Sequence, residues 1–255
     1  MIPAGSGPGA RHILPNPPRG KKTNCYILFP VLYEIATIAV PPPLILTVDR
    51  CLQTALPVAN VLNLPIHVEH GEFATARTSP QLLTATLSGL SEWYSPVAPG
   101  TGLHPRPLAA ADLNRYFTEI DPSWSSVWYP SRKGEDVKEV HARVNGFLDL
   151  FVPEVETRFA DQHENILLVS HAATTIALCR GLLALPDMPL RVGCCSVSEF
   201  SRKPATHGIV GAWDTEKLVD GSHLKDGASR DWGFEDIEMA NGKVCHPKTK
   251  LKSSS

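Results

Sequence analysis

Arg50, His70 and His171 each follow closely on a short apolar run of this 255-residue chain, at points where strands are expected to end. A guanidinium group offers a planar fork that matches two oxygens of a phosphate. An imidazole donates hydrogen bonds and moves protons near neutral pH. If the fold brings these side chains together, we expect them to form a site for a phosphate monoester.

The segments around these residues alternate between strand-length apolar runs and stretches with helical spacing. Strands are expected at 44–48, 65–69, 165–170 and 194–200, and helices at 50–63, 112–120, 135–159 and 174–184. Such alternation is typical of a three-layer α/β/α sandwich with a mainly parallel sheet. Because ligands bind at the carboxyl ends of parallel strands, Arg50 and His171 are expected at one edge of that sheet. His70 is interpreted as a structural residue beside them.

Composition excludes several other classes of protein. The chain is 43% hydrophobic with a net charge of −2, so it offers no general field for direct binding to nucleic acid. Six cysteines without C-x-x-C or zinc spacing predict reduced thiols and no metal site. The sequence also lacks G-x-G-x-x-G, P-loop and G-x-S-x-G motifs, which argues against dinucleotide, nucleotide and esterase chemistry.

The first 43 residues differ from the rest of the chain. Residues 1–20 are rich in glycine and proline, and 25–40 form an almost wholly apolar run. Pro30, Glu34 and the prolines at 41–43 make that run a poor membrane span, so it is interpreted as a buried or misplaced hydrophobic segment. We expect a disordered or atypical segment at 1–43, one domain at 44–245 and a disordered tail at 246–255.

Three segments resemble, in order, signatures of the histidine phosphatase superfamily, which has the phosphoglycerate-mutase-like fold. They are RCLQTA at 50–55, GLSEWY at 89–94 and VSHA at 169–172. Longer stretches look like a fungal branch of the superfamily that includes a phosphatase-like tau subunit of the polymerase III factor TFIIIC. The resemblance covers 44–71 and 89–244.

The resemblance implies a phosphomonoester hydrolase that works through a phosphohistidine, without metal or other cofactor. Arg50 would clamp the phosphate, with Ser170 as a further substrate-binding residue. Glu92 would be the general acid that protonates the leaving alcohol, and His171 would stabilise the charge on the transferring group. These roles are physically coherent, since a leaving alkoxide needs a proton donor.

Two departures from the family pattern concern the front of the domain. The family nucleophile lies in Arg-His-Gly after the first strand, but the only Arg-His pair here is Arg11-His12, which Ile13 follows. Arg11 and His12 are therefore the candidates for that motif. In addition, 72–89 interrupts the expected join between Gly71 and the next signature. We interpret 72–89 as an insertion, and both 72–89 and 13–43 as wrongly spliced or translated sequence of a gene-model or splice variant.

A second function follows from the altered motif. Without a histidine after the first strand, the chain would be a catalytically inactive, phosphatase-shaped interaction subunit, for example within a polymerase III transcription-factor complex. The expected partners are a small-molecule or protein phosphomonoester for the enzyme and that complex for the subunit. No membrane partner is expected, and either function predicts a cytoplasmic or nuclear location.

Overall fold

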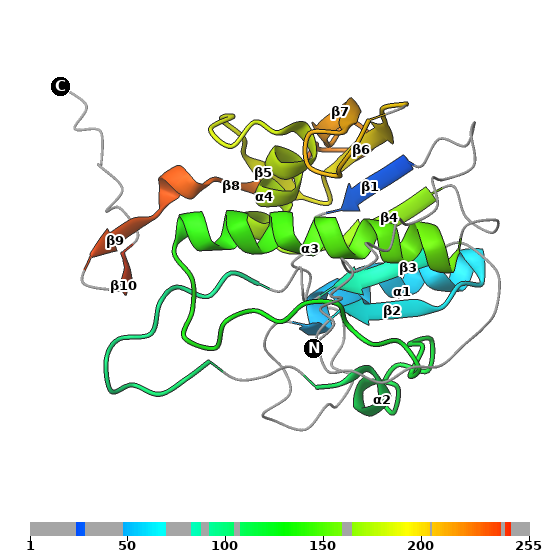
Figure 1. The fold of residues 1–255 in the computed structure, drawn as a ribbon, viewed down its shortest axis with the longest axis horizontal. Coiled ribbons are helices and arrows are strands. Elements are labelled where there is room, and N and C mark those ends of the chain that lie inside the picture. The colour runs from blue at the N-terminus through cyan, green and yellow to red at the C-terminus, as the bar shows by residue number, and fades with distance from the viewer. Residues whose placement is uncertain are drawn as a thin grey trace, which may run out of the picture.

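The computed structural model describes residues 24–28, 48–69, 83–87, 92–104, 108–159, 165–204, 206–240 and 243–245. Its centre is a six-stranded sheet with the strand order β2-β3-β4-β1-β6-β7 (Figure 1). Four of these strands run parallel to one another: β2 (Ile66–Glu69), β3 (Leu83–Leu87), β4 (Asn165–Val169) and β1 (Asn24–Leu28). The other two, β6 (Val197–Arg202) and β7 (Trp213–Asp220), continue the sheet in antiparallel fashion.

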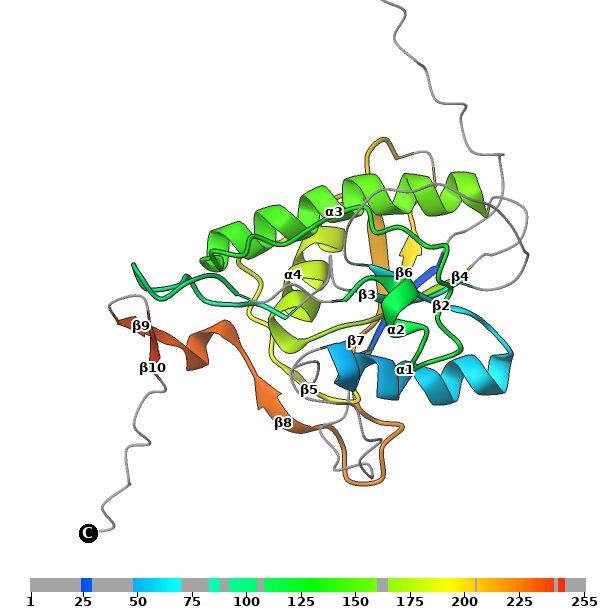
Figure 2. The same ribbon diagram turned by 90° about the horizontal axis from the view of Figure 1, so that it is seen from below.

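Helices cover both faces of this sheet. In Figure 2, α3 (Val137–Arg158) and α4 (Ala172–Leu183) lie on one side of the strands and α1 (Val48–Leu62) lies on the other, near the short α2 (Ala110–Leu113). The α/β/α expectation with a mainly parallel sheet is thereby confirmed. Two smaller pairs complete the described strands: β5 (Val192–Cys194) with β8 (Ser229–Trp232), and β9 (Glu238–Ala240) with β10 (Lys243–Cys245). A 3-10 turn, η1 (Phe234–Asp236), follows β8.

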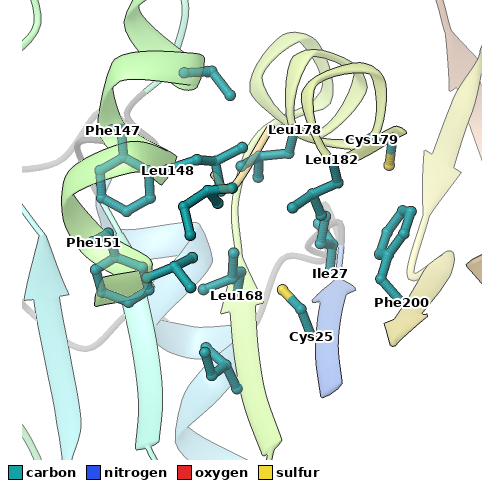
Figure 3. Close-up of a cluster of buried hydrophobic side chains, with 14 of the residues drawn as sticks. Cys25, Ile27, Phe147, Leu148, Phe151, Leu168, Leu178, Cys179, Leu182 and Phe200 are labelled. Atoms are coloured by element: carbon teal, nitrogen blue, oxygen red, sulfur yellow. The ribbon is translucent and has the colours of Figure 1, made fainter. Parts of the chain in front are cut away.

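Alternation along β4 shows how the sheet separates two cores. Ile166 and Leu168 pack into the cluster beneath α3 and α4, whereas Val169 belongs to the cluster beneath α1. This is the two-residue period of a strand with helices on both faces. Figure 3 shows the larger cluster, in which Phe147 of α3 and Leu178 of α4 lie over the strands.

The helix α3 begins with a well-defined cap. The Asp136 side chain accepts a hydrogen bond from the Glu139 backbone N–H, and the Glu139 carboxylate accepts one from the Asp136 N–H. This capping box satisfies N–H groups at the start of α3 and fixes where the helix begins. The period of the apolar residues predicted this helix, and its bounds differ from the predicted 135–159 by one or two residues.

The first strand was predicted in the wrong place. Val48 opens α1 instead of closing a strand at 44–48, and the rest of that predicted strand lies outside the described residues. A strand of the central sheet is Asn24–Leu28, so five residues of the segment 1–43, which was expected to be disordered or atypical, are ordered as a strand. The strand was missed because it lies at the start of the apolar run 25–40, which is much longer than a strand and gives no local sign of where one ends.

Part of 72–89, the segment interpreted as an insertion, forms a strand of the central sheet. Residues Leu83–Leu87 form β3, which pairs in parallel with both β2 and β4. Removing them would break the sheet between those two strands. The remaining residues of 72–89 lie outside the described part of the chain, as do most of 13–43 and all of 246–255.

Candidate functional site

The predicted site lies where β4 ends and α4 begins. Val169 is the last residue of β4, Ser170 is fully buried, and His171 is the N-cap of α4 with 7% of its surface exposed. The His171 carbonyl accepts a hydrogen bond from the Thr175 N–H at 2.7 Å. The imidazole is thus held at the carboxyl edge of the sheet, beside the positive end of a helix dipole, where an anion is favoured.

The first turn of α1 faces the same edge. Cys51 Sγ lies 3.4 Å from His171 Nε2, and both side chains are buried. Arg50 precedes Cys51 and is half-buried, with its backbone carbonyl accepting a hydrogen bond from Thr54 Oγ1. An arginine at a helix N-terminus opposes the helix dipole, so this position favours a bound anion.

Glu92 completes the group of side chains. It is half-buried, and burial raises the pKa of its carboxyl above the ordinary value, while the positive charge of Arg50 acts in the opposite direction. Burial also raises the pKa of the Cys51 thiol, with Glu92 adding to the effect and Arg50 opposing it. Arg50, Glu92 and His171 therefore lie together around Cys51, although Arg50 and His171 are 121 positions apart along the chain.

This group can bind an anion and donate a proton. A raised carboxyl pKa keeps more of Glu92 protonated near neutral pH, which a general acid requires. Arg50 provides a permanent positive charge, and His171 provides a ring N–H. Sequence reasoning missed the contact of Cys51 with His171. The position of Cys51 next to Arg50 on a helix turn was the available signal.

Backbone contacts hold the segment that carries Glu92. The Trp93 indole N–H donates to the Glu135 carbonyl at 2.6 Å, and the Glu135 N–H donates to the Tyr94 carbonyl at 2.8 Å. The Glu135 carboxylate in turn accepts from Arg143 Nε at 2.8 and 2.9 Å, and both of these side chains are buried. Residues far from Glu92 in the sequence thus fix the backbone next to it.

The residues after β1 stand where the family pattern has the histidine nucleophile. Leu28 pairs with Val169, so the residues that follow the two strands start from the same level of the sheet. In the sequence Phe29 and Pro30 follow β1, where the family pattern expects Arg-His-Gly. Arg11 and His12 precede this strand and lie outside the described residues, as does His70.

Sequence reasoning also missed a buried carboxylate. Glu69, the last residue of β2, has no exposed surface and accepts hydrogen bonds from the Trp124 indole N–H, the Ser126 hydroxyl and the Val127 N–H at 2.7 to 2.8 Å. Burial raises the pKa of Glu69 to about 7. A glutamate that closes an apolar strand was the signal for a buried polar group.

Two features are absent from the described residues. No three His, Cys, Asp or Glu side chains among them are arranged to hold a metal ion. None of the helices in the described ranges is both long and apolar enough to cross a membrane.

Comparison with known proteins identified a family and several similar proteins. The model of the histidine phosphatase superfamily (branch 1) matches residues 88–215, half of the chain. The transcription factor tau 55 kDa subunit of Saccharomyces cerevisiae is 32% identical over 234 residues, which cover 81% of this chain and 49% of that protein. This chain therefore spans about half the length of the curated relative it matches.

Solved structures with similar folds share less sequence. The ecdysone phosphate phosphatase from Bombix mori is 13% identical, with coverage of 77% of this chain and 93% of that chain and a TM-score of 0.44. A mycobacterial hydrolase, titled hydrolase 2, is 19% identical, with coverage of 78% and 91% and a TM-score of 0.39.

Proposed function

The chain belongs to the histidine phosphatase superfamily, and on this premise we propose that its site binds phosphomonoesters and hydrolyses them. One observation carries the proposal: Arg50, Glu92 and His171 lie together at the carboxyl edge of the sheet, around Cys51. The family resemblance implies a role for each of these three residues, and the roles fit their chemistry.

The reaction would proceed in two steps. A histidine nitrogen attacks phosphorus, the bond from phosphorus to the alcohol oxygen breaks, and Glu92 gives its proton to the leaving oxygen. Water then attacks the phosphorus of the phosphohistidine, the bond from phosphorus to the histidine nitrogen breaks, Glu92 takes up a proton from that water, and inorganic phosphate leaves. Arg50 would hold two phosphate oxygens throughout, and His171 would donate a hydrogen bond to the charge that develops on the transferring group.

The nucleophile is the open part of this mechanism, and His12 is its candidate. It belongs to the only Arg-His pair of the sequence, but it precedes β1 by 12 residues, whereas the family pattern has the histidine after the first strand. The proposal therefore requires that His12 reach the site occupied by Arg50 and His171.

The end of β1 favours a second function. Phe29 and Pro30 follow β1 and cannot accept a phosphoryl group, which would leave a pocket that binds phosphate without turning it over. The chain would then be a docking subunit, and a relative that is named a transcription factor subunit supports this alternative. Its partner would be a transcription-factor complex, and its location would be nuclear.

Hydrolysis and phosphate binding, measured together, separate these functions. We would assay p-nitrophenyl phosphate between pH 5 and 7, and the binding of inorganic phosphate by calorimetry, for the wild type, His12→Ala and His171→Ala. Hydrolysis that both variants abolish supports the phosphatase with His12 as its nucleophile. Phosphate binding without hydrolysis, lost in His171→Ala, supports the docking subunit. A folded chain that neither binds nor hydrolyses overturns the assignment of the pocket.

A further inference from the structure

The segment Ser229–Asp236 lies beyond the range that matches the family model, yet it reaches the residue next to Glu92. After β8 the chain turns at η1, and the Phe234 ring lies edge-on to the Trp93 ring, with 5.7 Å between their centroids and 67° between their planes. Edge-to-face contacts of this kind stabilise by about 0.5 to 1.5 kcal/mol beyond the burial of area. Trp93 directly follows Glu92, so this contact bears on the backbone of the acid.

Trp93 is held on two sides. Its indole N–H donates to the Glu135 carbonyl at 2.6 Å, which fixes one edge of the ring against the residues just before α3. Phe234 packs against the ring itself. A tryptophan with both a hydrogen bond and a ring contact has little freedom to rotate, and the backbone of its neighbour is restricted with it.

Phe234 is itself fixed by residues from other elements. Its ring lies 5.3 Å from the ring of His141 on α3 and 5.3 Å from that of Trp232 on β8. The Arg180 guanidinium of α4 lies 5.5 Å from the Phe234 centroid, and Arg180 Nε donates to the Met188 carbonyl. Phe234 therefore packs between α3, α4 and Trp93.

A set of ion pairs joins this segment to Arg191, the residue before β5. Arg191 Nε lies 2.7 Å from Asp231 Oδ2, and Arg191 Nη2 lies 2.7 Å from Asp236 Oδ2, so one guanidinium holds acids on both sides of Phe234. The Glu235 carboxylate is 3.9 Å from Arg191 Nη1. Each exposed pair is weak alone, but a planar guanidinium that binds two carboxylates fixes the geometry between them.

We propose that Phe234 is a positioning residue for Glu92, acting through Trp93, so that the segment after the family-matched range completes the acid's site. This inference rests on the proposed role of Glu92 as the general acid. It assigns a function to a part of the chain that the family model does not cover, and it makes the Arg191 ion pairs a support of that function.

The charged groups around the two residues set the expected direction of change. Arg50 and Cys51 of α1 lie near Glu92. His141 of α3 and Arg180 of α4 contact Phe234. Arg191 and Glu235 form an ion pair beside it. Burial is the main cause of the raised pKa of Glu92. If Phe234 no longer supports Trp93, Glu92 gains solvent and its pKa falls toward the ordinary value.

The test is the titration of the Glu92 carboxyl by carbon-13 NMR, with its signal assigned by its loss in Glu92→Gln. We expect Phe234→Ala to lower the pKa of Glu92 and Phe234→Tyr, which keeps the ring, to leave it as in the wild type. Arg191→Gln releases the segment without changing Phe234 or Trp93 and should lower it in the same direction. The control Tyr116→Ala removes an exposed ring after α2 and should change nothing.

Activity gives the second readout. If the wild type hydrolyses aryl phosphate, Phe234→Ala should lower the rate about tenfold or more and move the high-pH limb of the profile to lower pH, because the protonated acid is lost earlier. An unchanged Glu92 titration in folded Phe234→Ala overturns the inference. If Phe234→Ala does not fold, the same result in Arg191→Gln overturns it. If the wild type does not hydrolyse, the proposed activity fails, but the titration still decides whether Phe234 positions Glu92.

Discussion

Replacing Glu69 by glutamine should change how the stability of the protein depends on pH. The Glu69 carboxyl has no exposed surface and accepts three hydrogen bonds from the segment around Trp124. Burial raises its pKa from 4.5 to about 7. The folded chain therefore keeps this proton over a range in which the unfolded chain has already released it.

The sign and the size of the effect follow from this difference. Between pH 4.5 and 7 the folded state binds more protons at Glu69 than the unfolded state, so the free energy of unfolding falls as pH rises and is level again above pH 7. A difference of 2.5 units, from 4.5 to about 7, corresponds to about 3 kcal/mol at 1.36 kcal/mol per unit. The pKa of Asp121 is lowered by its contact with His67, so its contribution lies below this window.

Urea unfolding at half-unit steps from pH 4.5 to 8 measures this effect. The difference in unfolding free energy between wild type and Glu69→Gln should change by about 3 kcal/mol across the range, in favour of the variant at high pH. The glutamine amide loses part of the hydrogen bonding, but that cost does not vary with pH and leaves the slope diagnostic. Glu216→Gln, on the exposed part of β7, is the matched control. Parallel curves for wild type and Glu69→Gln would refute the reasoning.

Three further substitutions test the site and the fold. Arg50→Ala should lower phosphatase turnover about a hundredfold or more, because it removes a preorganised positive charge; an unchanged rate would contradict its role. Arg143→Met should cost about 3 to 5 kcal/mol in urea unfolding by leaving a buried carboxylate unpaired, whereas Lys217→Met at an exposed pair should cost under about 1 kcal/mol. Ile27→Ala should cost about 2 to 5 kcal/mol because Ile27 is fully buried in β1, with Val61→Ala, 84% exposed, as the near-neutral control. Equal effects of Ile27→Ala and Val61→Ala would place 24–28 outside the core.

The sequence predicted the elements whose pattern is local. Apolar spacing of three and four residues marked the helix at Val137–Arg158, and short apolar runs marked the strands at Ile66–Glu69 and Asn165–Val169. His171 follows β4, as the rule for ligands at the carboxyl ends of parallel strands predicts. The same rule placed Arg50 after a strand at 44–48, but Arg50 lies in the first turn of α1, and it is near His171 because the neighbouring Cys51 contacts His171.

Other features depend on contacts that no local pattern carries. β1 lies in an apolar run that also contains Pro30 and Glu34, so nothing in the run separates its five strand residues from the rest. β3 reads LTATL, a short alternation of apolar residues with threonine that sequence reasoning assigned to an insertion, and its pairing with two neighbours makes it a central strand. The contact of Phe234 with Trp93 joins residues 141 positions apart and required the tertiary structure.

The place of β1 in the sheet has a consequence for how the chain assembles. β1 is the joint between the parallel strands and the antiparallel pair β6 and β7, and its partners begin at Asn165 and end at Arg202. During synthesis β1 therefore stays without its partner strands until β4 and β6 have been made. Contacts of such long range slow folding, because the entropy of a long loop is lost before they form. Until β1 pairs, its own apolar residues and the edges of β4 and β6 that it later covers are exposed. We therefore expect this stage of folding to be prone to aggregation and to be assisted by chaperones.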